Sequence, residues 1–315
     1  MIETWQLRKS FRSRKRVVRA VRGVSLAVPA GQIFGFLGSN GAGKTTTMRM
    51  LVTLIRPDQG IAVVAGADVR KAPVEVRRRI GYVSQGGGTW ADATPRTELV
   101  DQARLYGISA PAARDRVARI VADLDLAAFA DRPCRTLSGG QRRRVDIAMG
   151  VVHAPRVVFL DEPTTGLDPQ SRAQMWDELR RLRDHGMTIF LTTHYLDEAD
   201  ALCDRIAIMD GGVVVAEGTP DELKRQISGD VVTVGLNGST SYAAHLLAGA
   251  RWVHELEADA HGLRFCVGDG ATAVPEVMRV LDGHGIRPGS IEVHRPSLDD
   301  VFLAKTGRSL SDGKG

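Results

Sequence analysis

The sequence has few cysteines, few aromatic residues and no long apolar run. Its three cysteines, Cys134, Cys203 and Cys266, are far apart and form no CxxC pair, which argues against a disulfide framework and against a zinc site. The most apolar stretches, residues 157–160 and 187–191, have the length of strands, whereas a membrane-spanning helix needs about 20 apolar residues. The first residues also lack the apolar core of a signal peptide. We therefore expect a cytosolic chain with reduced thiols that does not cross a membrane by itself.

The net charge of +5 is unevenly distributed, because many of the basic residues lie in one segment near the start. One interpretation is attraction to anionic phospholipid or to nucleic acid. The other is a solvated loop and strand face, which the lack of an aromatic platform for bases favours. The basic residues of this segment are Arg8, Lys9, Arg12, Arg14, Lys15, Arg16, Arg19 and Arg22.

The order of apolar segments predicts an α/β fold for most of the chain. Apolar strands are expected at residues 33–37, 157–160, 188–192 and 206–209, with helical periodicity between the last three. Strands that alternate with helices form βαβ units and a mostly parallel sheet. The intervening stretch is mainly helical, and we expect a helical subdomain at about residues 86–150.

A second, smaller domain is expected after about residue 227, and the length of 315 residues allows it. The expected elements between residues 231 and 294 follow the order β, α, β, β, α, β, which is the ferredoxin-like pattern. We therefore assign residues 1–226 to the main domain and 227–308 to an accessory or regulatory α+β domain. Residues 309–315 are expected to form a loose tail.

The segment from Gly38 to Thr45 matches G-x-x-x-x-G-K-[ST] directly after an apolar strand and before a helix. Glycines allow consecutive backbone N–H groups to surround phosphates, and the amino end of the helix adds a partial positive charge. Lys44 supplies a charge to the terminal phosphates and Thr45 a hydroxyl to Mg²⁺. The predicted nucleotide ligands are Gly38, Ser39, Asn40, Gly41, Ala42, Gly43, Lys44, Thr45 and Thr46.

Two carboxylates, Asp161 and Glu162, follow the apolar strand at residues 157–160. Ligands of doubly wound sheets bind at the carboxyl ends of the strands, so both acids are expected at the nucleotide. We predict that Asp161 holds Mg²⁺ and that Glu162 orients or deprotonates the attacking water.

Five further motifs in the first 220 residues resemble those of the ABC ATPases. Leu137-Ser138-Gly139-Gly140-Gln141 resembles the signature of that family, and Gly166-Leu167-Asp168-Pro169 resembles its D-loop. Gln85 follows a strand as in the Q-loop, and His194 ends a strand like the switch histidine. Phe11 lies where the family places an aromatic residue to stack on adenine, although packing is an equally good interpretation of that ring.

The resemblance implies an α/β P-loop ABC ATPase core with a β-subdomain and a helical subdomain. It also implies that two subunits, here a homodimer, enclose two ATP molecules, with Ser138, Gly140 and Gln141 of one subunit facing the γ-phosphate held by the other. His194 would then contact the γ-phosphate, Gln85 would reach Mg²⁺ and the water, and Asp168 would link the two sites. The expected cofactors are ATP and Mg²⁺, and the expected partner is an ABC-type membrane permease. The permease would hold the chain at the cytoplasmic side of the membrane.

Longer stretches, such as DEPTTGLDPQSR and PSLDDVFLAKTGR, resemble the daunorubicin-resistance type of drug-export ATPase, including its small carboxy-terminal domain. This resemblance implies export of drugs or other hydrophobic compounds. The alternative is a non-transport ABC ATPase acting on nucleic acid or ribosomes. A single cassette without coiled-coil insertion or zinc spacing argues against it, and nucleic acid is not an expected partner. A switch that does not hydrolyse ATP is disfavoured because Glu162 and His194 are both present.

Two segments depart from the family pattern. Gly86-Gly87-Gly88 follows Gln85, which predicts a flexible segment, and then comes Trp90. Trp90 either anchors a helix of the permease or packs inside its own helical subdomain. The run Arg142-Arg143-Arg144 after the signature is interpreted as the solvated face of a helix, without an assigned role.

Overall fold

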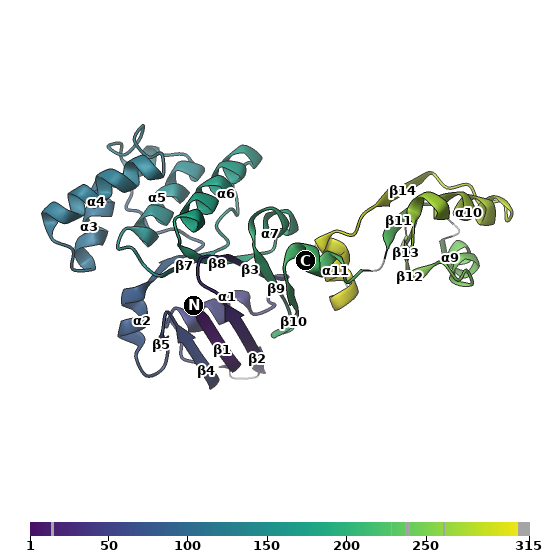
Figure 1. Ribbon diagram of the computed structural model, residues 1–315, viewed down its shortest axis with the longest axis horizontal. Coiled ribbons are helices and arrows are strands. Elements are labelled where there is room, and N and C mark those ends of the chain that lie inside the picture. The colour runs from purple at the N-terminus through teal and green to yellow at the C-terminus, as the bar shows by residue number, and fades with distance from the viewer. Residues whose placement is uncertain (14–15, 228, 237, 239, 261, 308–315) are drawn as a thin grey trace. The chain divides into compact units, whose positions relative to one another are not determined.

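The computed structural model describes residues 1–13, 16–227, 229–236, 238, 240–260 and 262–307. Arg14, Lys15 and the predicted tail at residues 309–315 therefore lie outside the described residues. The chain divides into two compact units, one ending at Pro220 and the other beginning at Asp221 (Figure 1). No helix in the described ranges is long and apolar enough to cross a bilayer.

The first unit is built on a six-stranded sheet. All neighbouring strands in it are parallel except β9 and β10, which form an antiparallel pair at one edge. Every residue of β3, β7 and β8 is buried, as expected for parallel strands covered on both faces. The predicted α/β core is thus confirmed. The strands, in spatial order, are β10 (Val213–Gly218), β9 (Arg205–Asp210), β3 (Ile33–Leu37), β8 (Thr188–Thr193), β7 (Val157–Asp161) and β6 (Ile80–Val83).

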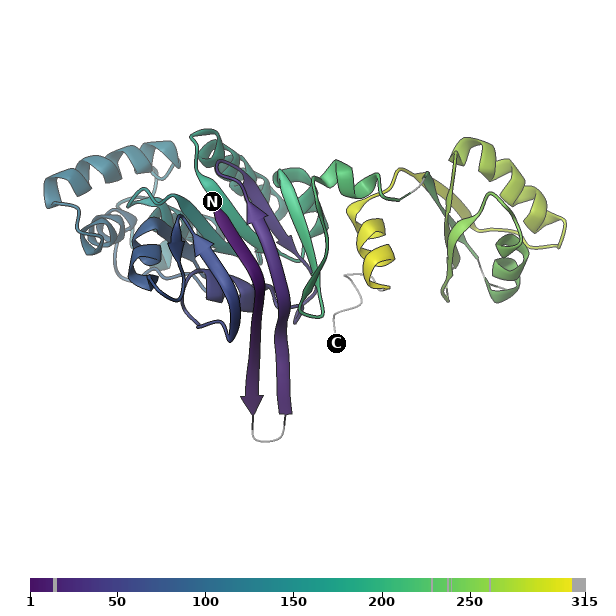
Figure 2. The same ribbon diagram turned by 60° about the horizontal axis from the view of Figure 1, so that its bottom comes forward.

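A second, antiparallel sheet has the order β2-β1-β4-β5. The ladder between its first two strands continues to the pair Ser13 and Arg16, so most of the basic segment is strand (Figure 2). The strands are β1 (Ile2–Ser13), β2 (Arg16–Val28), β4 (Gln59–Val64) and β5 (Ala67–Asp68).

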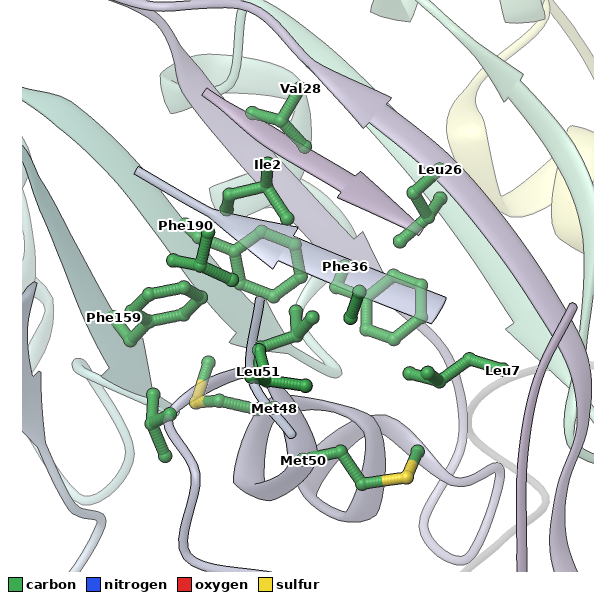
Figure 3. Close-up of a cluster of buried hydrophobic side chains, with 14 of the residues drawn as sticks. Ile2, Leu7, Leu26, Val28, Phe36, Met48, Met50, Leu51, Phe159 and Phe190 are labelled. Atoms are coloured by element: carbon green, nitrogen blue, oxygen red, sulfur yellow. The ribbon is translucent and has the colours of Figure 1, made fainter. Parts of the chain in front are cut away.

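One apolar core joins the two sheets and helix α1 (Lys44–Leu51), as Figure 3 shows. Phe190 lies at its centre, with ring centroids of Phe34, Phe36 and Phe159 at 5.4 to 5.6 Å. Burial of each such ring stabilises the fold by about 1.5–3 kcal/mol. Because these rings come from β3, β7 and β8, they fix the strands whose carboxyl ends carry the predicted site residues.

Of the remaining helices of this unit, α6 and α7 contact the central strands of the six-stranded sheet, α2 contacts β5 and β6, and α3 contacts both α4 and α5 in a helical group (Figure 1). Three of them begin at a side chain that accepts a backbone N–H, namely Thr94, Ser138 and Asp168. The helices are α2 (Pro73–Arg79), α3 (Pro95–Leu105), α4 (Ala110–Asp123), η1 (Cys134–Thr136), α5 (Gly139–Val151), α6 (Pro169–Asp184) and α7 (Leu196–Leu202).

The second unit has an antiparallel sheet of order β12-β13-β11-β14. With one helix after the first strand and another after the third, this order is that of a ferredoxin-like fold, as predicted. Its core includes Val232, Leu247, Phe265 and Val277. The elements are α8 (Pro220–Lys224), β11 (Asp230–Gly235), α9 (Thr240–Ala248), β12 (His254–Ala258), β13 (Gly262–Val267), α10 (Gly270–Asp282), β14 (Ser290–His294) and α11 (Leu298–Thr306).

Candidate active site

The glycine-rich loop between β3 and α1 is enclosed by neighbouring backbone. Gly43, with φ +109°, directly precedes α1, and a Cβ there would lie 2.4 Å from the carbonyl oxygen of Ala20. A Cβ on Gly38 would lie 2.3 Å from the carbonyl oxygen of Met209. Both positions therefore require glycine. No side chain caps the start of α1, so its first N–H groups are available to an anion.

Lys44, the first residue of α1, is 4% exposed. Its Nζ donates to the carbonyl oxygens of Gly38 at 2.6 Å and Ser39 at 3.2 Å, across the loop. Burial lowers the pKa of Lys44, while Glu162 and Asp161 act in the opposite direction. The ammonium group is thus held by the loop at the place where the motif requires a positive charge.

Asp161 ends strand β7 and is buried. Its Oδ1 accepts hydrogen bonds from Thr45 Oγ1 at 3.1 Å and from Thr192 Oγ1 at 2.7 Å. The carboxylate therefore connects the first turn of α1 with the ends of two adjacent parallel strands.

Glu162, the next residue, has a left-handed backbone with φ +47°, a conformation that is uncommon outside glycine. Its backbone N–H donates to Thr192 Oγ1 at 3.1 Å. The side chain accepts from Gln85 Nε2 at 3.1 Å and from Thr165 Oγ1 at 3.2 Å. The two adjacent carboxylates therefore have different partners: Asp161 accepts from Thr45, and Glu162 accepts from Gln85.

Two cationic or potentially cationic groups also approach this carboxylate. His194 Nδ1 lies 3.3 Å from Glu162 Oε1, and Lys44 Nζ lies 3.9 Å from the same oxygen. The pKa of Glu162 is lowered, mainly by His194 and to a smaller extent by Lys44, although burial opposes both. Glu162 is therefore a carboxylate at neutral pH.

The structure thus brings together Lys44, Gln85, Glu162 and His194, which lie at or after the carboxyl ends of β3, β6, β7 and β8. These strands are parallel neighbours or near neighbours, so their ends meet at one edge of the sheet. Residues that are up to 150 positions apart in the chain (from Lys44 to His194) contact one carboxylate.

The signature residues lie at a different place, the amino end of α5. Ser138 Oγ accepts from the Gln141 N–H at 3.2 Å, and Gln141 Oε1 accepts from the Ser138 N–H at 3.0 Å. This capping box leaves Ser138 exposed. Asp168 caps α6 by accepting from Ser171 N at 2.9 Å and Ser171 Oγ at 2.6 Å. A Cβ on Gly140 would lie 3.0 Å from Ser171 Oγ, so the two helix ends are adjacent.

Within the residues that the structure describes, no hydrogen bond or ion pair joins Ser138, Gly140, Gln141 or Asp168 to the cluster around Glu162. The sequence-predicted site is therefore in two parts in a single chain.

Phe11 lies on β1 opposite Val18 and is 44% exposed. Lys9 Nζ lies 5.7 Å from the centroid of its ring. The ring is thus not part of the apolar core, and stacking on adenine stays a prediction.

The interpretation of residues 142–144 as a solvated helix face is wrong for two of the three arginines. Arg142 is exposed, but Arg143 is 7% exposed and donates to backbone carbonyl oxygens of the site. Arg144 Nε lies 3.0 Å from Glu178 Oε1. The signal was the helical spacing, because Arg143 precedes the buried Ile147 by one turn and so shares its face.

Trp90 is 77% exposed. The alternative in which its side chain packs inside the helical subdomain is therefore wrong. Its backbone N–H donates to the buried Glu98 Oε1 at 3.1 Å, so the main chain is held at this position.

A phosphate-binding loop after β3, a carboxylate pair at the end of the parallel strand β7, and a separate capped signature helix define an ATP-hydrolysing cassette. Residues 21–165 match the ABC transporter family, and residues 218–306 match the ATP-binding protein DrrA1-3-like, C-terminal domain. The daunorubicin/doxorubicin resistance ATP-binding protein DrrA of Streptomyces peucetius is 46% identical over 301 residues, which cover 93% of this chain and 90% of that protein. The chain therefore belongs to the ABC transporter family of ATP-binding proteins, and it is an ATP-binding and ATP-hydrolysing enzyme.

Two further similarities agree with this family. The Nod factor export ATP-binding protein I of Burkholderia orbicola is 40% identical over 295 residues, 93% of each chain. A solved ATP-binding subunit of an ABC transporter superposes with a TM-score of 0.62 and 27% identity, over 72% of this chain and 92% of that one. A dimeric ATP-binding cassette bound to ADP and Pi has a TM-score of 0.64 at 24% identity, over 70% and 98% of the two chains, and supports the fold.

Proposed function

We propose that this chain is the motor subunit of an exporter of drugs or other hydrophobic compounds, acting through a separate membrane permease that holds it at the cytoplasmic side of the membrane. The convergence of Lys44, Gln85 and His194 on Glu162 carries the motor part of the proposal. The names of the relatives, which refer to daunorubicin resistance and to Nod factor export, support the export part.

ATP binds through its phosphates to the loop Gly38–Thr45. The uncapped first turn of α1 offers its N–H groups, and Lys44 exchanges the carbonyl oxygens of Gly38 and Ser39 for phosphate oxygens. Thr46 donates to a phosphate nearer the ribose. Phe11, exposed on β1, stacks on the adenine ring.

Mg²⁺ fits the oxygen atoms beside this loop. Thr45 Oγ1 and Asp161 Oδ1 lie 3.1 Å apart, and hydroxyl and carboxylate oxygens are the ligands that Mg²⁺ prefers. The amide oxygen of Gln85 would be a third donor to the ion, because the amide nitrogen already donates to Glu162. When bound, the ion would neutralise charge on the phosphates.

Glu162 positions the attacking water and accepts its proton. Its lowered pKa keeps it deprotonated, and its left-handed backbone directs the side chain toward Gln85 and His194. His194 contacts the γ-phosphate on one side and Glu162 on the other.

A second copy of the chain completes the site. Ser138, Gly140 and Gln141 lie at the partly exposed amino end of α5, where N–H groups and the helix dipole favour a phosphate. They face the γ-phosphate bound by the other copy, and Asp168 links the two sites. The permease contacts the segment after Gln85, where Trp90 presents an exposed indole as an anchor.

The test is the substitution Glu162→Gln, purified from the native host with Mg·ATP, beside the wild type and the matched surface variant Glu3→Gln. We expect the ATPase rate to fall at least about 100-fold in Glu162→Gln only, and a polytopic membrane protein to co-purify in near-stoichiometric amount. Trp90→Ala in the same background should lose that partner. Mass spectrometry and absorbance at 260 nm identify the co-purified material, and ribosomes or nucleic acid without a membrane protein would overturn the export role.

A further inference from the structure

Arg143 joins two backbone segments, the one that precedes Gln85 and the one that contains the carboxylate pair. From the second turn of α5, Arg143 Nη1 donates to Ser84 O at 2.6 Å, Nη2 to Asp161 O at 3.0 Å and Nε to Pro163 O at 2.8 Å. One planar group therefore fixes the residue before Gln85 relative to both sides of Glu162. Arginine suits this role because its donors are arranged rigidly in one plane.

Asp146, one turn further along α5, holds the other end of the same segment. Its Oδ1 accepts from the Gly88 N–H at 3.0 Å. Gly87 fits closely beneath it, with φ +71° and a would-be Cβ only 2.7 Å from Asp146 Oδ2. The three consecutive glycines were predicted to be flexible, but two of them, Gly87 and Gly88, contact the Asp146 carboxylate.

Gln85 lies between these two anchors, and its Nε2 reaches Glu162 Oε2 at 3.1 Å. A movement of α5 would change the positions of Ser84 and Gly88 together, and with them the position of the Gln85 amide. The same helix begins at the capped Ser138, which is where the proposed second copy acts.

The two anchors are buried charges that the proposed reaction does not use. Burial lowers the pKa of Arg143 and raises that of Asp146, and the attraction between them opposes both shifts. Desolvation of such a pair is costly, and apolar side chains of similar size would often be as stable. Apolar side chains could not, however, make the hydrogen bonds by which Arg143 and Asp146 hold the backbone.

We propose that Arg143 and Asp146, here called the α5 clamp, are positioning residues that set Gln85 against Glu162 and so make the carboxylate pair competent only when α5 is in place. This inference rests on the proposed hydrolysis at Glu162 and deepens it. The clamp transmits the position of the signature helix to the site without touching ATP.

The experiment measures kcat and KM for Mg·ATP in the full chain with Arg143→Gln, Asp146→Ala and, as the matched control, Arg142→Gln at the exposed neighbouring position. We expect kcat to fall about 10- to 100-fold in the first two variants, since small displacements of reacting groups have effects of this size. KM should stay within about threefold because the Lys44 loop is untouched, and Arg142→Gln should behave as the wild type.

The deciding readout is a double-mutant cycle with Gln85→Ala. If the clamp acts through Gln85, Arg143→Gln should reduce kcat of the Gln85→Ala variant by less than about threefold. Additive losses, an unchanged kcat, or equal changes in kcat and KM would overturn the proposal. If Arg143→Gln does not fold, Arg143→Lys, which keeps the charge but not the planar fork, takes its place in the cycle.

Hydrogen exchange separates this inference from the proposed function. A wild-type chain that hydrolyses no ATP would refute the proposed function, and exchange at residues 84–88 then tests the clamp alone. Faster exchange at these amides in Asp146→Ala than in Arg142→Gln supports the clamp, and equal exchange overturns it.

Discussion

Two glutamates of the same unit, the partly buried Glu162 and the buried Glu178, lie in surroundings that move their pKa values in opposite directions. At the strand ends, Glu162 accepts hydrogen bonds from Gln85 and Thr165 and has His194 at 3.3 Å, and its pKa is lowered. Between α5 and α6, Glu178 has Arg144 Nε at 3.0 Å, yet burial raises its pKa to about 7. A charged partner is present in both places, so the presence of a cation does not explain the difference.

The difference lies in how many donors reach each carboxylate. Both oxygens of Glu162 have a donor or a histidine nitrogen within 3.3 Å, whereas Glu178 Oε2 has no hydrogen-bond partner in the described residues. Hydrogen bonds to the charged form offset desolvation at Glu162, and burial prevails at Glu178. The active site therefore holds its carboxylate charged, while the helix interface holds one that takes up a proton near neutral pH.

The largest effect is expected from His194→Ala, which removes the main cause of the lowered Glu162 pKa. We expect the ATPase rate to fall roughly 100-fold. Because a higher Glu162 pKa means that the carboxylate is protonated at higher pH, the acid limb of the kcat profile should move upward in pH. His185→Ala, at the exposed end of α6, is the control and should change neither. An acid limb that stays in place would show that His194 does not act on Glu162.

The phosphate loop and the strand-end site could be predicted because their information is local or follows from topology. The loop Gly38–Thr45 is contiguous, and its strand–loop–helix order appears in the sequence itself. Gln85, Glu162 and His194 each follow a predicted apolar strand, and parallel strands place their carboxyl ends at one edge. The ferredoxin-like order of the second unit was predicted for the same reason. Its strands and helices follow one another along the chain, and each type of element has its own spacing of apolar residues.

What could not be predicted depends on contacts between distant backbone segments. Arg143 is buried because carbonyl groups 59 and 18 positions away, at Ser84 and Asp161, point at it. The helical spacing to Ile147 indicates that Arg143 is the member that faces inward, but it carries no sign of the carbonyl groups that this arginine will meet. The long β1–β2 hairpin was missed because basic residues in an edge ladder resemble a solvated loop.

The comparison is sharpened by Glu178→Gln, measured as the free energy of unfolding against pH. Glu178 has a folded pKa of about 7, well above the ordinary glutamate value of 4.5, so the folded state binds more protons between these values. The stability of the wild type should therefore fall as pH rises from about 4.5 to 7, by about 3 kcal/mol. The glutamine variant should lack this fall. Parallel curves for the two proteins would place the Glu178 pKa near its usual value.

The smallest effect is expected in the second unit, where the buried Asp300 serves the fold alone. Its Oδ2 accepts from Ser297 N at the start of α11, and it pairs with Arg264 of β13. Asp300→Ala removes both the cap and the ion pair, whereas Asp300→Asn keeps an acceptor for the cap. We expect losses of about 1–2 kcal/mol for alanine and less for asparagine in denaturant unfolding. The ATPase rate should stay within about twofold in both, because the partners of Asp300, namely Ser297, Arg264 and His294, belong to the second unit. A tenfold loss of ATPase activity in a folded Asp300→Asn protein would show that this unit, too, acts on hydrolysis.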